Sequence, residues 1–245
     1  MTLTNITDIQ PFISQERALT FINQYQKCNP ENTVDQEYSM QKAYQLYMWN
    51  IQMSGALLEV LAWYEVVLRN SIMKVISYKF YPYGIFNNRF ILSLNDTTAQ
   101  IFIDAVNSVH PTEKYILKWD EKGRMSAPNI QNASEGRVIA ELGFGFWENL
   151  LSKKYNKGMW EPHFRRAFPN MTNSSDVEIV YSITQDIRKI RNRVCHHEPI
   201  FKLNGNNILA NIEKVLNYID PVLVDTMMKI ERISSLEIER INKAL

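Results

Sequence analysis

The sequence is poor in the residues that interrupt helices, with only 8 Gly and 9 Pro among 245 residues. It contains no low-complexity tract and no repeat of fixed period. No segment alternates apolar and polar residues in the manner of a β-strand. Since 45% of the residues are apolar, the chain can bury a substantial core. The sequence therefore predicts an all-α protein, and we expect one domain over residues 1–245.

Cysteine is almost absent, and metal ligands do not gather in the sequence. Cys28 and Cys195 fit neither a zinc-binding spacing nor a disulfide framework, as expected in a reducing cytoplasm. Cys195 is expected to pack as a small, weakly polar side chain rather than to react. No set of His, Cys, Asp and Glu has the spacing of metal ligands, so neither a metal nor another cofactor is expected.

Neither positive nor negative charge predominates, because the formal net charge at pH 7 is +1. This balance argues against a protein that coats nucleic acid through its overall charge, so any RNA contact must be a local basic patch. Residues 1–10 lack the basic and apolar regions of a signal peptide. The longest apolar run, about 56–68, is broken by Glu59 and Glu65. We therefore expect a cytoplasmic protein without a membrane span.

Helices are predicted along most of the chain. Capping residues, Pro and Gly place them at about 14–26, 34–80, 97–109, 135–155, 175–197, 207–218 and 221–245. Gly55 is expected to bend or break the second helix. Gly143 and Gly145 fall inside the fourth, where the close approach of another helix would account for them.

The segment 175–201 carries the main candidate residues. Ser175 and Glu178 have the spacing of a capping box, which predicts the start of a helix. Pro199 disfavours the helical conformation for the residue before it, so the helix is expected to end near His197. One apolar stripe on this helix is expected to face the core, and it consists of Val180, Ile183, Ile187, Ile190 and Val194.

Polar residues gather near the end of the same helix. Asn192 and His196 lie four residues apart on the side opposite the stripe, so they are expected to face solvent, a cleft or a second subunit. Histidine titrates near neutrality, and the guanidinium of Arg191 matches a phosphate. The residue types alone leave a second interpretation open, in which these residues form no active site. The helix macrodipole favours cations at any helix C-terminus.

The string Arg191 to His196 resembles the signature of the HEPN superfamily: an Arg, a polar residue that is commonly Asn, and a His after a gap of four to six residues. The flanking residues 187–190 and 197–201 resemble the Abi-like (abortive infection) branch of that superfamily. Four more strings are similar to this branch, so the resemblance covers most of the chain; they lie at 14–17, 49–70, 141–147 and 160–170.

This resemblance implies a single HEPN-like helical domain with additional N- and C-terminal helices. It implies a metal-independent endoribonuclease of a prokaryotic phage-defence or toxin-type system, which cleaves RNA by 2′-hydroxyl attack and leaves 2′,3′-cyclic phosphate ends. In this interpretation His196 is the general acid or base, Arg191 binds the phosphate and Asn192 orients it. The accessory candidates are His197, Arg188 and Arg193. A homodimer with a composite active site is also implied, with a regulatory RNA or an antitoxin protein as a further partner.

A second set of basic residues is a weaker candidate for RNA binding. It consists of Lys153, Lys154, Arg165, Arg166 and Arg69. Basic residues interleaved with aromatic ones can hold single-stranded RNA. The alternative interpretations are solvated helix ends for the basic zone and, favoured over RNA contact, a structural role for Arg69. Two other functions stay open for the whole protein: a non-catalytic RNA- or nucleotide-binding module, and a protein-interaction component of a toxin–antitoxin or defence pair.

Overall fold

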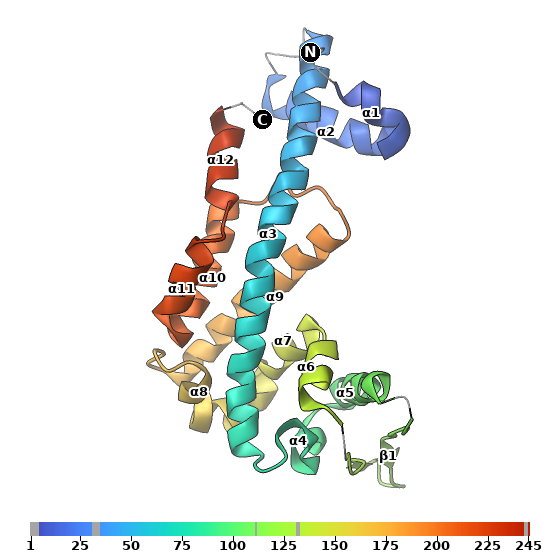
Figure 1. The fold of residues 1–245 in the computed structure, drawn as a ribbon, viewed down its shortest axis with the longest axis vertical. Helices are drawn as coiled ribbons and strands as arrows, with labels where there is room; N and C mark the ends of the chain where they lie inside the picture. Colours follow the sequence, from blue (N-terminus) through green and yellow to red (C-terminus); the bar gives the residue numbers. More distant parts are fainter. Residues whose placement is uncertain (1–4, 31–34, 111, 131–132, 243–244) are drawn as a thin grey trace. The chain divides into compact units, whose positions relative to one another are not determined.

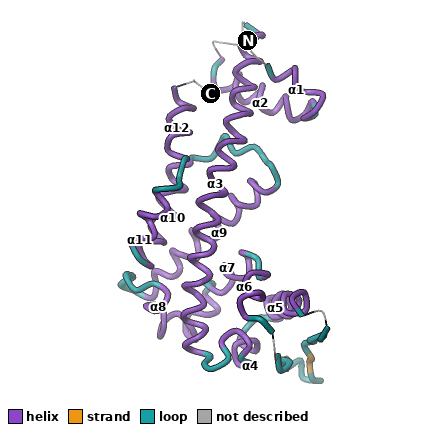
Figure 2. The backbone as a smooth tube through the Cα atoms, in the orientation of Figure 1, coloured by secondary structure: helices purple, strands orange, loops and turns teal. Residues whose placement is uncertain are grey.

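The computed structural model describes residues 5–30, 35–110, 112–130, 133–242 and 245. These residues contain twelve α-helices, and 75% of the structure is helical (Figure 2). Within the described residues the only strands are β1 (Lys118–Trp119) and β2 (Met125–Ser126), an antiparallel pair of two residues each. The prediction of an all-α protein is confirmed.

The chain divides into two compact units. Unit 1 comprises residues 1–61, 190–211 and 227–245, and unit 2 comprises residues 62–189 and 212–226. Four helices contribute residues to both units: α3 (Gln36–Lys79), α9 (Val177–Cys195), α10 (Gly205–Ile219) and α11 (Pro221–Met228). The single domain over residues 1–245 stays a prediction.

Helix α3 is one uninterrupted helix of 44 residues (Figure 1). Gly55 lies inside it and does not divide it, and the start predicted near Val34 falls outside the described residues. By length and composition, α3 is the one helix in the described part of the chain that could cross a membrane. Of its most apolar stretch, 44% is buried within the protein, and the core helix of a soluble protein has the same properties. The absence of a membrane span therefore stays a prediction.

Unit 1 is built around an aromatic contact between α2, α3 and the segment after α9. Its shorter helices are α1 (Ile6–Ile13), α2 (Gln15–Cys28) and α12 (Ile233–Asn242), of which α1 is not among the predicted helices. Ser14 caps α2 as expected, since its hydroxyl accepts a hydrogen bond from the backbone N–H of Arg17. The ring of Phe21 lies edge-on to Tyr47 at 5.0 Å and to Phe201 at 5.3 Å between centroids.

Unit 2 consists of short helices joined by tight turns. The helices are α4 (Asn88–Ser93), α5 (Asp96–Val109), α6 (Glu135–Glu141), α7 (Phe144–Leu150) and α8 (Glu161–Ala167). Three turns are 3₁₀-helical, at Gly84–Phe86, Lys153–Tyr155 and Ser174–Asp176, and one is π-helical, at Asn156–Trp160. The Phe102 ring packs against Phe90 and Phe146, with centroids 6.1 and 6.3 Å away, which anchors α4, α5 and α7 to one another.

Two predicted helices are interrupted in the structure. The helix expected over 135–155 ends at Glu141 and resumes at Phe144, with Gly143 as the N-cap of α7. A Cβ on Gly143 would meet none of the described atoms within 4 Å, and one on Gly145 would meet only a side-chain carbon of Arg188 at 3.8 Å. The explanation by a closely approaching helix is therefore wrong. The region expected to be helical over 221–245 is likewise divided, into α11 and α12.

Helix α9 agrees closely with the prediction. A 3₁₀ turn precedes it, so the α-helix begins at Val177, two residues after the predicted cap, and it ends at Cys195. Four residues of the predicted stripe are buried, and Ile190 is half-buried. On the same helix, the Thr184 hydroxyl lies 2.7 Å from the hydroxyl of the fully buried Tyr64. Burial raises the pKa of that phenol.

Candidate functional site at the end of helix α9

The last turn of α9 closes with a Schellman motif. The Glu198 N–H donates to the Arg193 carbonyl at 2.9 Å, and the His197 N–H donates to the Val194 carbonyl at 3.0 Å. His197 occupies the left-handed position of this motif, with a φ of 55°. Glycine is usual there, because the left-handed conformation costs an L-residue roughly 1–2 kcal/mol. Surrounding contacts must therefore hold this turn in place.

Side chains from three helices of unit 1 hold the turn. From within α9, Arg193 donates to the Pro199 carbonyl at 2.7 Å and forms an ion pair with Glu198 at 3.3 Å. From α2, the Arg17 guanidinium donates to the His197 carbonyl. From α3, the buried Asn50 accepts a hydrogen bond from the Ile200 N–H at 2.7 Å through its side-chain oxygen. The backbone from Arg193 to Ile200 is thus fixed by side chains that are distant in sequence.

His196 lies on this fixed turn, Arg191 and Asn192 lie in α9 just before it, and the side chains of all three are available. Arg191 and Asn192 are half-buried, and His196 is exposed. A backbone bond of 2.9 Å from the His196 N–H to the Asn192 carbonyl places these two residues one turn apart, about 6 Å along the axis, as predicted. Among the described residues, none forms a hydrogen bond or ion pair with the side chains of these three. The structure therefore brings a guanidinium, an amide and an imidazole together at one helix end.

Of the accessory candidates, only His197 has an available side chain. The Arg193 guanidinium is engaged by Glu198 and the Pro199 carbonyl, so it supports the turn. Arg188 belongs to unit 2, where it pairs with Glu148, a carboxylate that is only 5% exposed. Both arginines serve the fold in this structure.

The weaker RNA-binding candidates all lie in unit 2, and their environments differ. Lys153 forms an exposed ion pair with Glu178 at 3.3 Å. Lys154 and Arg165 are exposed, each over an adjacent aromatic ring. Arg69 is half-buried on α3, and its Nε is buried without a hydrogen-bond partner in the described structure. This placement favours the structural interpretation of Arg69.

Arg166 is the member of this set with the closest aromatic contact. Its guanidinium carbon lies 3.2 Å from the ring centroid of Tyr78, at the end of α3. Tyr78 also packs edge-on against His163, and Lys79 follows it in the chain. Tyr78 and Lys79 could not be predicted from the sequence as members of this set, since they are more than 80 residues from α8 and no local pattern indicates the contact.

Within the described residues we find no second candidate site built from cysteines or from clustered metal-ligating residues. No group of three or more His, Cys, Asp and Glu side chains in the described residues could hold a metal ion. Cys28 and Cys195 are both exposed free thiols. The prediction that Cys195 packs is wrong, because it lies at the solvent side of the last turn of α9.

Comparisons with known proteins yield no relative: no family model matches the chain, and neither a curated protein nor a solved structure is similar to it. Function must therefore be argued from the geometry of the sites themselves.

Proposed function

We propose that this protein is a metal-independent endoribonuclease of the Abi-like HEPN type, acting in a prokaryotic phage-defence or toxin-type system. One observation carries the proposal. Arg191, Asn192 and His196 project unpaired from a helix end whose backbone is fixed by Arg17, Asn50 and Arg193. Catalytic residues need a rigid support. Some residues must hold the backbone in place while others remain free to bind the substrate and react.

The proposed reaction is transesterification within RNA. The imidazole of His196 accepts the proton of a ribose 2′-hydroxyl, and the oxygen attacks the adjacent phosphorus. The bond to the 5′-oxygen of the next nucleotide breaks, and this leaving oxygen takes up a proton. A 2′,3′-cyclic phosphate and a 5′-hydroxyl remain. General acid–base catalysis of this kind contributes typically about 10²–10⁴-fold.

Arg191 binds the scissile phosphate and offsets the charge that builds up on its oxygens in the transition state. Asn192, one turn before His196, orients the phosphate. The reaction needs a proton acceptor on one side of the phosphorus and a donor on the other. In a homodimer, the second imidazole comes from His196 of the other copy, so that the active site is composite. His197, the accessory candidate that directly follows His196 in the chain, is the other imidazole at this helix end.

A non-catalytic RNA- or nucleotide-binding module is the alternative. The stacking of Arg166 on Tyr78 in unit 2 favours it, because cations and aromatic rings hold RNA without any reaction. In that case Arg191 would matter more for binding than His196.

The deciding experiment is cleavage of a pool of single-stranded and structured RNA by purified protein in EDTA. Wild type is compared with His196→Ala and with the control Lys202→Ala, a change at an exposed residue six positions away. We expect cleavage by wild type and Lys202→Ala, with 2′,3′-cyclic phosphate ends, and loss of cleavage in His196→Ala. If wild type and His196→Ala are equally inactive while both bind RNA, the alternative replaces the proposal.

A further inference from the structure

Two cationic side chains and a histidine gather at the C-terminal end of α3, and we refer to Lys79, His163 and Arg166 as the cation cluster. Tyr78 links two of them: Arg166 covers the face of its ring at 3.2 Å, and the His163 ring lies 5.4 Å away, edge-on. Lys79 donates a hydrogen bond to the Gly158 carbonyl in the π-helical turn that leads into α8. All of these residues belong to unit 2.

No acid neutralises the cation cluster within the described structure. None of its three members forms an ion pair there with Asp or Glu. Two lowered pKa values accompany this lack of acids, and burial is the largest cause of each. Burial, followed by the charges of Lys79 and Arg166, lowers the pKa of His163, and burial together with Arg89 lowers that of Lys79. Cations assembled without a counter-charge are stabilised by a bound anion, and such perturbed groups often mark binding sites.

A cavity of about 930 Å³ opens beside the same end of α3. Tyr81, only two residues after Lys79, lines it together with Tyr83, and these side chains are 81% and 68% exposed. The chain length alone keeps the Cα atoms of Lys79 and Tyr81 within about 7 Å. The cation cluster and the cavity therefore both lie at the C-terminal end of α3 in unit 2.

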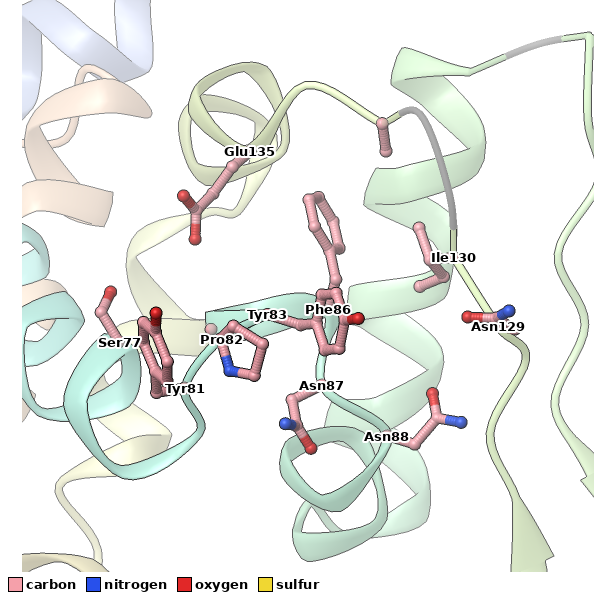
Figure 3. Close-up of a pocket in the computed structure, with 12 residues that line it drawn as sticks. Ser77, Tyr81, Pro82, Tyr83, Phe86, Asn87, Asn88, Asn129, Ile130 and Glu135 are labelled. Carbon is pink, nitrogen blue, oxygen red and sulfur yellow. The ribbon is translucent and has the colours of Figure 1, made fainter.

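Glycine is favoured at position 84, which lines the cavity. Gly84 has a φ of 52°, and a Cβ on it would lie 2.9 Å from a carboxylate oxygen of Glu135 on α6. A larger residue would be strained in its backbone and would also displace this carboxylate. In Figure 3 the Glu135 side chain extends from its helix toward this turn.

The cavity offers aromatic rings and unpaired amides. Phe86 and Ile130 supply apolar surface beside the exposed tyrosines. Asn88, from α4, and Asn129, from the segment after β2, also line the cavity (Figure 3). These amides form no hydrogen bond with the described residues, in contrast to Asn87, which caps α4 and donates to the Phe80 carbonyl.

This chemistry suits a nucleobase. An unstacked base is held by an aromatic ring against its face, and an Asn amide, with donors and an acceptor side by side, matches base edges. Among the described residues that line the cavity there is no Lys or Arg. The cavity is thus suited to a base, and the cation cluster at the same end of α3 is suited to a phosphate.

We propose that the C-terminal end of α3 is a binding site for single-stranded RNA, in which the cation cluster takes a backbone phosphate and the cavity takes an unstacked base. This proposal rests on the proposed function in one respect: RNA is chosen as the ligand because it is the proposed substrate. It involves none of the residues of the α9 site, so it can be tested without cleavage.

The test uses fluorescence anisotropy with a labelled 2′-O-methyl RNA of about 12 nucleotides, a length within the range that single-strand binding domains cover. This RNA has no free 2′-hydroxyl, so the proposed reaction cannot consume it. Binding is measured between about 50 and 200 mM salt. Lys79→Gln and Arg166→Gln are compared with Lys122→Gln, which removes the same charge at an exposed residue in the turn between β1 and β2.

We expect Lys79→Gln and Arg166→Gln each to weaken binding and to reduce the slope of log affinity against log salt by about 0.7 per lost phosphate contact. Lys122→Gln should bind as wild type does. Tyr83→Ala and Asn88→Ala should weaken binding at every salt concentration, by about tenfold for the tyrosine, without changing the slope. Upon RNA addition, the NMR titration of His163 should move to higher pH.

The proposal is overturned if the two cluster variants bind with the affinity and salt slope of Lys122→Gln. It is also overturned if only the cluster variants weaken binding and the cavity variants do not, since the surface would then be a basic patch without a base site. Cleavage of unmodified RNA by wild type, measured in parallel, separates the two claims. If wild type cleaves RNA and the cluster variants bind as wild type does, the endoribonuclease proposal is supported and this site is refuted. If the variants weaken binding as expected but wild type does not cleave, this site is supported and the endoribonuclease proposal is not.

Discussion

The guanidinium of Arg17, in the first turn of α2, donates a hydrogen bond to the backbone carbonyl of His197, 180 residues later in the chain. The contact ties the N-terminal helices of unit 1 to the turn that carries His196. Arg17 therefore acts on the candidate site through the backbone and is a positioning residue.

Replacing Arg17 should impair cleavage more than stability. Arg17→Ala releases the His197 carbonyl, and a displacement of about 1 Å at the reacting groups can cost up to about 10²-fold in rate. We expect kcat/KM for RNA cleavage to fall at least tenfold while Tm changes by only a few degrees. Arg17→Lys, which keeps one donor, should recover part of the activity. Equal activity of wild type and Arg17→Ala would contradict the positioning role.

His197→Gly separates the backbone role of this residue from any role of its side chain. Because His197 has a φ of 55°, glycine should relieve left-handed strain and raise the free energy of unfolding by roughly 1 kcal/mol. His197→Ala keeps the strain and serves as the control. Urea unfolding measures both variants. If His196 is the acid–base residue, both variants retain cleavage, and loss of activity in both would transfer that role to His197.

Helix α9 could be predicted from sequence because its signals are local. The spacing of Val180, Ile183 and Ile187 specifies the buried face, and Pro199 limits how far the helix can extend. The positions of Asn192 and His196 on one side follow from the same periodicity, and the structure places them accordingly. Local patterns thus suffice for the candidate site itself.

What supports the site could not be predicted in the same way. Asn50 looks like any polar residue of a long helix, and its bond to the Ile200 N–H exists only because the chain brings residues 150 positions apart together. The gathering of Lys79 and Arg166 around Tyr78 could not be predicted for the same reason, since the two residues are far apart in the sequence. The break at Gly143 had a local signal, since glycine weakens helices, but the helical pattern of the flanking residues concealed it.

His163 should make stability depend on pH. Because the folded protein lowers its pKa below the ordinary value of 6.5, the unfolded chain binds the proton more readily. Stability contributed by the neutral imidazole is therefore present above about pH 6.5 and is lost as the pH falls below it. We expect the decrease in unfolding free energy from pH 8 to pH 5 to be smaller in His163→Gln than in wild type. Urea unfolding at both pH values measures this, and an equal decrease in the two proteins would refute it.

Arg188 should prove essential for stability and dispensable for RNA binding. Arg188→Ala leaves the carboxylate of Glu148, 5% exposed, without its partner. Because the Arg188 side chain is itself 39% exposed, the cost should stay below the roughly 3–5 kcal/mol of a fully buried pair. Arg188→Ala/Glu148→Gln removes the unpaired charge and should recover most of that loss in urea unfolding. The same double variant should bind 2′-O-methyl RNA as tightly as wild type, because the guanidinium is committed to Glu148. A stable double variant with weakened RNA binding would instead make Arg188 an RNA contact.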